Sequence, residues 1–222
     1  MSAVVPHPIS VMLPPLPEGP GLVFVLSGPA GSGKTTLCDL LLAEAPRARR
    51  LVTCTSRAPR PGERDGVDYH FLSAAAFETA LAAGEFFEHA LVHGNHYGSR
   101  ARDARALLEQ RFDVLLNIDV QGAATLRAKA AADPALAGKL VDIFLYPPPV
   151  AQLRERLRKR AQDDNEEIER RLRNAAVEVA RWGEFGYLLP SGTREEDVQR
   201  LRAIYIAERL RERPGLALAA WP

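Results

Sequence analysis

The sequence is poor in the features that define several other classes of protein. Its 222 residues include only two cysteines, Cys38 and Cys54, which is too few for a disulfide framework. We therefore expect both to be small buried side chains in a reducing compartment. No apolar run reaches the roughly 18 residues that a membrane-spanning helix needs. The N-terminus lacks a basic region and is interrupted by prolines, unlike a secretory signal, so we expect a soluble, cytoplasmic protein.

Net charge is also nearly absent. The chain has 29 basic and 28 acidic residues, which gives a formal charge of +1. A protein whose main task is non-specific nucleic-acid binding needs a strongly basic face, so we expect neither a nucleic-acid nor a membrane partner. Lysine is scarce, at only four of the 29 basic residues, and the rest are arginine. Arginine binds phosphate through a planar fork, which leaves a role in phosphate binding open.

From Gly21 onward, short apolar runs alternate with segments of helical character. We expect strands at 22–26, 51–55, 69–72, 86–92, 114–119, 141–146 and 187–189. We expect helices at 37–45, from Ser73 to Gly84, at 101–111, from 121, at 150–160, at 166–182 and from Thr193 to about 213. This alternation predicts an α/β fold with a mostly parallel sheet in one large domain.

The segment Gly28-Pro29-Ala30-Gly31-Ser32-Gly33-Lys34-Thr35 matches the pattern G-x-x-x-x-G-K-[ST] between an expected strand and an expected helix. Its glycines let the backbone turn its N–H groups toward phosphate oxygens, and the helix start adds its positive end. Lys34 is predicted to contact the β- and γ-phosphates, and the Thr35 hydroxyl is predicted to bind Mg²⁺. The predicted nucleotide-binding segment runs through Thr36.

A second phosphate site is predicted between residues 53 and 99. Arg57 and Arg60 lie three residues apart in a loop stiffened by proline, so both guanidinium groups can converge on one anion. Glu63 can hold one of these arginines in position. Hydroxyl groups further along the chain suit a phosphate monoester, and a lone carboxylate can accept hydrogen bonds from the N1–H and N2–H₂ groups of guanine. The carboxylate and hydroxyl candidates are Tyr69, Glu88, Tyr97 and Ser99.

Taken together, these motifs resemble guanylate kinases over about residues 21–180. The matching runs are the phosphate loop, T-C-T-S-R-A-P-R-P-G-E, D-Y-H-F, F-F-E-H-A, G-N-H-Y-G-S, N-I-D-V-Q-G and R-L-R-K-R-A-Q-D-D-N-E-E-I-E-R-R-L, in the same order and spacing. The resemblance implies a three-layer P-loop core with a parallel sheet, an inserted GMP-binding lobe and a small helical lid. It also implies that ATP and Mg²⁺ are used.

The resemblance assigns roles to individual residues. It implies that Arg57, Arg60, Tyr69 and Tyr97 bind the GMP phosphate, with Glu63 in the same substrate site. It implies that Thr53, Glu88, Ser99 and Asp119 read guanine, and that Asp119 shares Mg²⁺ with Thr35. It implies that Arg160 and Arg171 act with Lys34 on the ATP phosphates. The expected layout is a proline-rich flexible tail at 1–20, a core at 21–52, 100–157 and 172–213, a GMP-binding lobe at 53–99, a lid at 158–171 and a C-terminal tail at 214–222.

The chain departs from the family pattern at several positions. Thr53 replaces a serine, His96 replaces a tyrosine, and Asn117 stands where an aspartate is usual. Ala161 replaces a glycine of the lid, and Ser191 replaces an asparagine that helps to hold adenine. The donor preference for ATP over other triphosphates therefore remains open.

The activity that these features predict is reversible transfer of the γ-phosphoryl group of ATP to GMP, which gives ADP and GDP. The acceptor oxygen is already anionic, so no general base is named. Two alternatives remain open: a non-catalytic guanylate-kinase-like binding module, and a kinase of the same fold for another phosphorylated small molecule. Simpler readings also remain for single residues, since Asp119 can be a helix cap and Arg156 can belong to a charged helix face.

Overall fold

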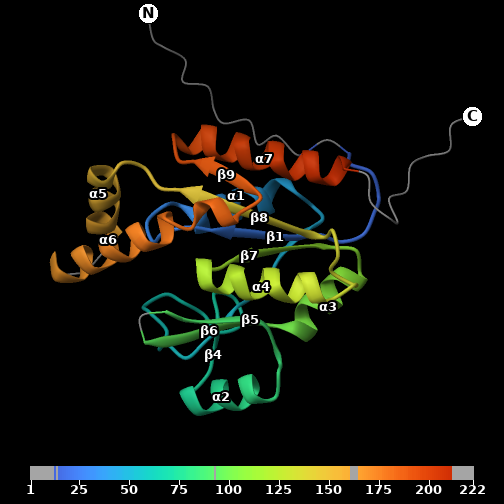
Figure 1. Cartoon of the computed structure of the whole chain (residues 1–222), viewed down its shortest axis with the longest axis horizontal. Helices are drawn as coiled ribbons and strands as arrows, with labels where there is room; N and C mark the ends of the chain where they lie inside the picture. The colour runs from blue at the N-terminus through green and yellow to red at the C-terminus, as the bar shows by residue number, and fades with distance from the viewer. Residues whose placement is uncertain (1–12, 14, 93, 161–164, 212–222) are drawn as a thin grey trace, which may run out of the picture.

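A five-stranded sheet organises the chain in the computed structural model, which describes residues 13, 15–92, 94–160 and 165–211 (Figure 1). Its strands lie in the order β2 (Ala48–Arg50), β7 (Asp113–Asn117), β1 (Val23–Ser27), β8 (Leu140–Tyr146) and β9 (Tyr187–Pro190). Every pairing within it is parallel, so each connection crosses over the sheet through other elements. The predicted α/β fold with a parallel sheet is confirmed.

The central strand β1 is buried on both faces. Phe24 and Leu26 pack on one side of the sheet, while Val23 and Val25 pack on the other. Side chains alternate between the two faces of a strand, so a strand covered on both sides is apolar throughout. This burial explains why the run appears in the sequence without polar interruptions.

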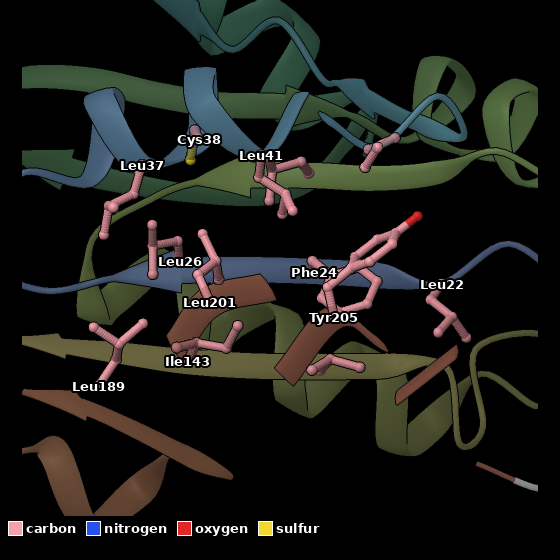
Figure 2. Packing of buried hydrophobic residues seen from close by; sticks show 14 of the residues in the cluster. Leu22, Phe24, Leu26, Leu37, Cys38, Leu41, Ile143, Leu189, Leu201 and Tyr205 are labelled. Carbon is pink, nitrogen blue, oxygen red and sulfur yellow. The ribbon is translucent and has the colours of Figure 1, made fainter. Parts of the chain in front are cut away.

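Helices cover each face of this sheet. On one face lie α1 (Lys34–Glu44) and α7 (Arg194–Leu210), whose residues Leu41, Leu201 and Tyr205 join the cluster around Phe24 in Figure 2. On the other face lie α3 (Ala101–Glu109) and α4 (Val120–Ala132). Cys38 of α1 is buried in the first cluster, and burial raises the pKa of its thiol to about 12. Both cysteines are free and buried.

A smaller sheet lies on the far side of α4 and forms the lower part of Figure 1. Its order is β4 (His70–Phe71), β3 (Cys54–Thr55), β6 (Asn95–Arg100) and β5 (Phe86–Val92). Helix α2 (Ala74–Ala82) packs Phe77 against Phe86 of this sheet, with the two ring centroids 4.3 Å apart. As predicted, Ser73 caps α2 by accepting a hydrogen bond from the backbone N–H of Ala76.

The remaining helices lie at one side of the main sheet. Helices α5 (Val150–Arg160) and α6 (Asn165–Val179) pack against each other through Leu153, Leu157 and Ile168. A short 3-10 turn, η1 (Trp182–Glu184), leads from α6 to β9. As predicted, Thr193 and Glu196 form a capping box at the start of α7.

Two expectations about strands were wrong. Only Cys54–Thr55 of the strand expected at 51–55 is a strand, β3 of the smaller sheet. The main-sheet strand β2 ends before that range, at Arg50, because the chain passes between the sheets at 51–53. The strand β6 was not expected, because its motif has few apolar residues; its pairing with β5 and β3 supplies the backbone hydrogen bonds. Helices α6 and α7 also end earlier than expected, at Val179 and Leu210.

The last part of the expected N-terminal tail packs against the core. Leu13 is buried in the main cluster, and its backbone N–H donates to the carbonyl of Glu44 at 3.2 Å. The Arg209 guanidinium donates to the carbonyls of Pro17 at 2.7 Å and Pro20 at 2.8 Å. The flexible-tail expectation therefore does not describe residues 15–20, while residues 1–12 and 14 lie outside the described part.

Arg209 also belongs to a buried cluster of polar side chains, together with Asp113 and Tyr205. The Asp113 carboxylate accepts hydrogen bonds from the Tyr205 hydroxyl at 2.6 Å and from the Leu22 N–H at 2.9 Å. An Arg209 nitrogen lies 3.4 Å from the same carboxylate. Burial raises the pKa of Asp113, and the hydrogen bond from Tyr205 opposes that shift. These contacts join the N-terminal segment, β7 and α7.

Among the described helices, none combines the length and the apolar character that crossing a membrane requires.

Candidate functional site

A cavity of about 620 Å³ opens between the main sheet, the smaller sheet and α6. Six parts of the described chain supply its walls: the loop after β1, the segment around β3 and β4, the β5–β6 pair, the end of β7, and the helices α5 and α6. Most of the predicted site residues line it, namely Gly28, Ala30, Gly31, Gly33, Lys34, Thr35, Thr53, Arg60, Tyr69, Glu88, Tyr97, Asp119 and Arg171. The fold therefore brings together residues that lie up to 143 positions apart in the sequence, from Gly28 to Arg171.

The loop between β1 and α1 has the backbone shape that its glycines allow. Gly28, Gly31 and Gly33 have φ angles of 136°, 82° and 110°, which residues with a side chain rarely adopt. A Cβ atom on Gly28 would also lie only 2.4 Å from the carbonyl oxygen of Leu145. Gly33 caps the start of α1, so the unsatisfied N–H groups of that helix face the loop. This arrangement favours an anion.

Lys34 and Thr35 begin α1 at the cavity wall. The Lys34 ammonium group donates to the carbonyls of Gly28 and Pro29, which folds its side chain back over the loop. The side-chain amide of Asn117, at the end of β7, donates to the Thr35 hydroxyl at 3.2 Å. The end of the central sheet therefore places an amide directly beside the threonine hydroxyl.

Across the cavity, one carboxylate organises the two-arginine loop. Both oxygens of Glu63 accept from the Arg57 guanidinium at 2.9 Å, and one also accepts from the Arg60 N–H at 2.7 Å. The Arg57 guanidinium lies 5.4 Å from the centre of the Tyr69 ring. Glu63 thus holds Arg57, as predicted, and Arg60 is the member of the pair that lines the cavity. That both arginines bind one phosphate remains a prediction.

Two tyrosines complete this wall. The Tyr69 and Tyr97 rings meet edge to face with centroids 5.9 Å apart. Burial raises the pKa of Tyr69, so its hydroxyl stays protonated and can donate a hydrogen bond to an anion near neutral pH. His96 stacks on Phe77 with ring centroids 5.1 Å apart, and lies outside the cavity lining.

Glu88 is the most deeply buried carboxylate of the cavity. Its side chain comes from β5, its residue is 1% exposed, and one oxygen accepts from the Ser99 hydroxyl at 2.7 Å. Burial raises the pKa of Glu88 to about 7, and the nearby Asp119 carboxylate adds to the shift. Thr53 lies in the same wall. A buried carboxylate with one oxygen already bonded is suited to a ligand that offers N–H donors.

The sequence left two alternatives for Asp119, a helix cap and a site residue; the structure shows the cap, and the site role remains a prediction. Its carboxylate caps α4 by accepting from the Gly122 N–H at 2.9 Å, and the same residue lines the cavity. The end of β7 therefore places one acid both at a helix start and beside the phosphate loop.

The donor set of this cavity suits a hydrated Mg²⁺ ion. Magnesium typically uses one or two protein oxygens together with water and substrate phosphates. The Thr35 hydroxyl and the Asp119 carboxylate both line the cavity next to the phosphate loop. Within the described ranges no group of three or more His, Cys, Asp or Glu side chains could hold a metal by itself. The residues thus fit an ion that arrives with its nucleotide.

Comparisons with known proteins agree with this geometry. The family model for guanylate kinases matches residues 21–208. The chain belongs to the guanylate kinase family. A guanylate kinase from Alkalilimnicola ehrlichii is 40% identical over 192 residues, covering 86% of this chain and 91% of the relative. One from Cereibacter sphaeroides is 42% identical over 191 residues, covering 86% and 88%. The crystal structure of the Anaplasma phagocytophilum guanylate kinase matches with a TM-score of 0.71 and 30% identity, covering 88% and 90%.

Not every predicted site residue of this guanylate kinase family member reaches the cavity wall. Those that do not line it are Pro29, Ser32, Thr36, Arg57, Glu63 and Ser99. Arg57, Glu63 and Ser99 instead contact residues that do. Arg160 is the last residue of α5, and its side chain lies outside the described part, as does Ala161. The predicted lid at 158–171 is therefore described only in part.

Two residues gained importance in the structure. Glu178 of α6 lines the cavity, where burial raises the pKa of its carboxyl to about 7 while Lys34 opposes the shift. No motif of the sequence analysis includes this residue. Arg156, which the sequence left undecided, places one nitrogen 3.4 Å from both the Ser32 carbonyl and the Ser191 hydroxyl. Ser191 in turn donates to Asp197 at 3.3 Å.

Proposed function

We propose that this chain catalyses the reversible transfer of the γ-phosphoryl group of ATP to GMP, giving ADP and GDP. One observation carries the proposal: a single cavity holds a phosphate loop on one wall and a separate set of arginine, tyrosine and buried carboxylate on the other. Two anion-binding walls that face one cavity suit a reaction between two phosphorylated substrates. This role would place the protein in GMP recycling in the cytoplasm.

The donor wall is the phosphate loop. Its inward N–H groups and the start of α1 would hold the ATP phosphates, and Lys34 would exchange its bonds to Gly28 and Pro29 for bonds to the β- and γ-phosphates. Arg171 lines the same cavity from α6, and Arg160 ends α5. We assign both arginines to neutralising charge on the transferred group.

The acceptor wall would bind GMP at two points. Arg57, Arg60, Tyr69 and Tyr97 would hold its phosphate, with Glu63 keeping Arg57 in position. Glu88 would accept hydrogen bonds from the N1–H and N2–H₂ groups of guanine, while Thr53, Ser99 and Asp119 complete the base site. A buried, partly satisfied carboxylate rejects bases that offer no donors, because its free oxygen would stay unpaired.

The chemical step needs little from the protein beyond position and charge. A GMP phosphate oxygen forms the new bond to the γ-phosphorus of ATP. The bond between the γ-phosphorus and the oxygen that bridges it to the β-phosphorus breaks, and ADP leaves. Mg²⁺, held by Thr35 and Asp119 together with the nucleotide phosphates, would neutralise the charge on those phosphates. A lid at 158–171 would exclude water and so limit hydrolysis of ATP. The core, GMP-binding lobe and tails would keep the boundaries given above.

A coupled assay tests this proposal. ADP release is measured with ATP and Mg²⁺ and, in turn, GMP, dGMP, AMP, CMP, UMP and dTMP. We expect turnover with GMP and, more weakly, with dGMP. No ADP release with GMP would refute the activity and leave a binding module, against which the intact Gly33, Lys34 and Thr35 argue. A faster rate with another monophosphate would favour a different acceptor. A second series with other triphosphates and GMP addresses the donor preference.

A further inference from the structure

Gly122 lies in the first turn of α4, in a position with no room for a side chain. A Cβ atom on this residue would lie 2.4 Å from one carboxylate oxygen of Glu88 and 3.4 Å from a carboxylate oxygen of Asp119. Ordinary contacts between nonbonded heavy atoms are about 3.5–4 Å long. The carboxylate of Glu88 therefore lies in the space that any side chain at position 122 would fill.

Glu88 has little freedom to move out of the way. It is 1% exposed, and its other oxygen accepts from the Ser99 hydroxyl at 2.7 Å. Glu88 and Ser99 face each other across the β5–β6 pair, so the bond is fixed by the strand register. The Lys129 ammonium group of α4 also donates to the carbonyl of Phe86, two residues before Glu88, and ties the helix to that strand.

The backbone does not explain a glycine at position 122. The residue is not among the glycines with positive φ, and it lies within α4, where alanine is more favourable than glycine. By helix propensity alone, an alanine there would stabilise the protein. What the glycine provides is room for Glu88.

We infer that Gly122 is a positioning residue for the acceptor base: by lacking a side chain, it lets α4 hold the Glu88 carboxylate at the depth from which that carboxylate reads guanine. Helix α4 lies between the two sheets, so it sets the base-reading acid of the smaller sheet relative to the phosphate loop of the larger one (Figure 1). The inference rests on the proposed function, in which Glu88 binds guanine.

The Gly122→Ala variant of the full chain tests the inference. We expect its KM for GMP to rise by at least about tenfold, as for the loss of a hydrogen bond to a charged group, and its KM for ATP to stay within about twofold. Inosine monophosphate lacks the N2 amino group, so the ratio of kcat/KM for GMP to that for inosine monophosphate should fall toward one. Gly183→Ala is the matched control, because a Cβ atom there meets nothing within 4 Å.

A second variant separates displacement of Glu88 from a general disturbance of α4. In Glu88→Asp the carboxylate is one methylene shorter and withdraws from Gly122. Adding Gly122→Ala to this background should cause little further rise in the KM for GMP, because the shorter aspartate side chain no longer places its carboxylate where the new methyl group would lie. Should Gly122→Ala alone fail to fold, the double variant should fold.

Each outcome distinguishes the inference from the proposed function. If the wild-type chain does not phosphorylate GMP, the proposed function fails first. If the wild type is active and Gly122→Ala keeps both its KM for GMP and its base selectivity, only the inference is overturned. An equal effect of Gly122→Ala in the wild-type and Glu88→Asp backgrounds, or a double variant that does not fold, also overturns it.

Discussion

The two walls of the cavity are built in different ways. The donor wall is made mostly of backbone: three glycines with positive φ and the start of α1 form it within one short segment. The acceptor wall is made of side chains from separate strands and loops, and some of them contact one another or a supporting side chain, as Tyr69 meets Tyr97 and Ser99 donates to Glu88. A wall made of backbone tolerates changes in its neighbours, whereas a wall made of side chains depends on them.

The largest effect is expected at the donor wall. Lys34→Ala should lower kcat by about 10³-fold, the order seen when a group that stabilises transition-state charge is removed. Steady-state rates of ADP formation measure it, with Lys139→Ala as control, since Lys139 is absent from the cavity lining. A near-normal rate for Lys34→Ala would contradict the assignment of the phosphate loop.

At the acceptor wall the effect should fall on one substrate. Arg60→Ala removes a charged partner of the GMP phosphate, so the KM for GMP should rise by roughly 10- to 100-fold with little change in the KM for ATP. Arg64→Ala is the matched control, because Arg64 lies in the same loop, is exposed and does not line the cavity. Equal changes in both KM values would show that Arg60 does not belong to the acceptor wall.

A change of pH should alter GMP binding less than the two substitutions above alter kcat or KM. The pKa of Glu88 is about 7, raised by burial and by Asp119, and guanine donors require the ionised form. Lowering the pH from 8 to 6 protonates Glu88, so the KM for GMP should rise by about tenfold beyond the contribution of the GMP phosphate itself. Glu88→Gln should bind GMP weakly, and its KM for GMP should keep only the pH dependence that comes from the GMP phosphate. An unchanged pH profile in Glu88→Gln would contradict the assignment.

The same pKa carries a consequence for stability. The folded chain holds the Glu88 proton more tightly than the unfolded chain, whose carboxyl has a pKa near the ordinary 4.5. The contribution of Glu88 to stability is therefore fully present below pH 4.5 and is lost as the pH rises through 7. The ionised Glu88 carboxylate that would bind guanine therefore makes the fold less stable at neutral pH than the protonated form does at low pH.

The smallest effect on catalysis is expected far from both walls. Tyr205→Phe removes the hydroxyl that donates to Asp113 at 2.6 Å. The loss should destabilise the fold by about 1–3 kcal/mol and lower the Tm by several degrees. Both KM values should stay unchanged, because Asp113 begins β7 and the cavity lies at its other end. Thermal unfolding measures the loss of stability, and steady-state kinetics measures the two KM values. A changed KM would show that the Tyr205–Asp113 contact also affects the cavity.

The contrast between the walls also explains what the sequence could predict. Phosphate binding by the loop at 28–35 remains a prediction, but the backbone shape of that loop was predictable, because its strand, turn and helix are contiguous and three of its glycines have positive φ angles. The two-arginine loop was predictable for the same reason, since Glu63 lies three residues after Arg60. Strand β6 and the break between β2 and β3 were not, because pairing between distant segments decides them.

The residues that the sequence could not single out reach the site from a distance. Glu178 lies on α6 without a motif, and only the packing of that helix brings it to the cavity wall beside Lys34. The role inferred for Gly122 depends on Glu88, a residue of another sheet, and no spacing rule within α4 reveals that contact.

The segment at 15–20 has a practical consequence for anyone who shortens this chain. A protein trimmed to begin at Gly21 looks attractive from the family match, which starts at that residue. The trim would remove the carbonyls of Pro17 and Pro20 that accept from Arg209, whose side chain is 2% exposed, and it would remove Leu13 itself from the main cluster. Tags and cleavage sites for purification therefore belong ahead of Leu13, where they leave the Arg209 contacts intact.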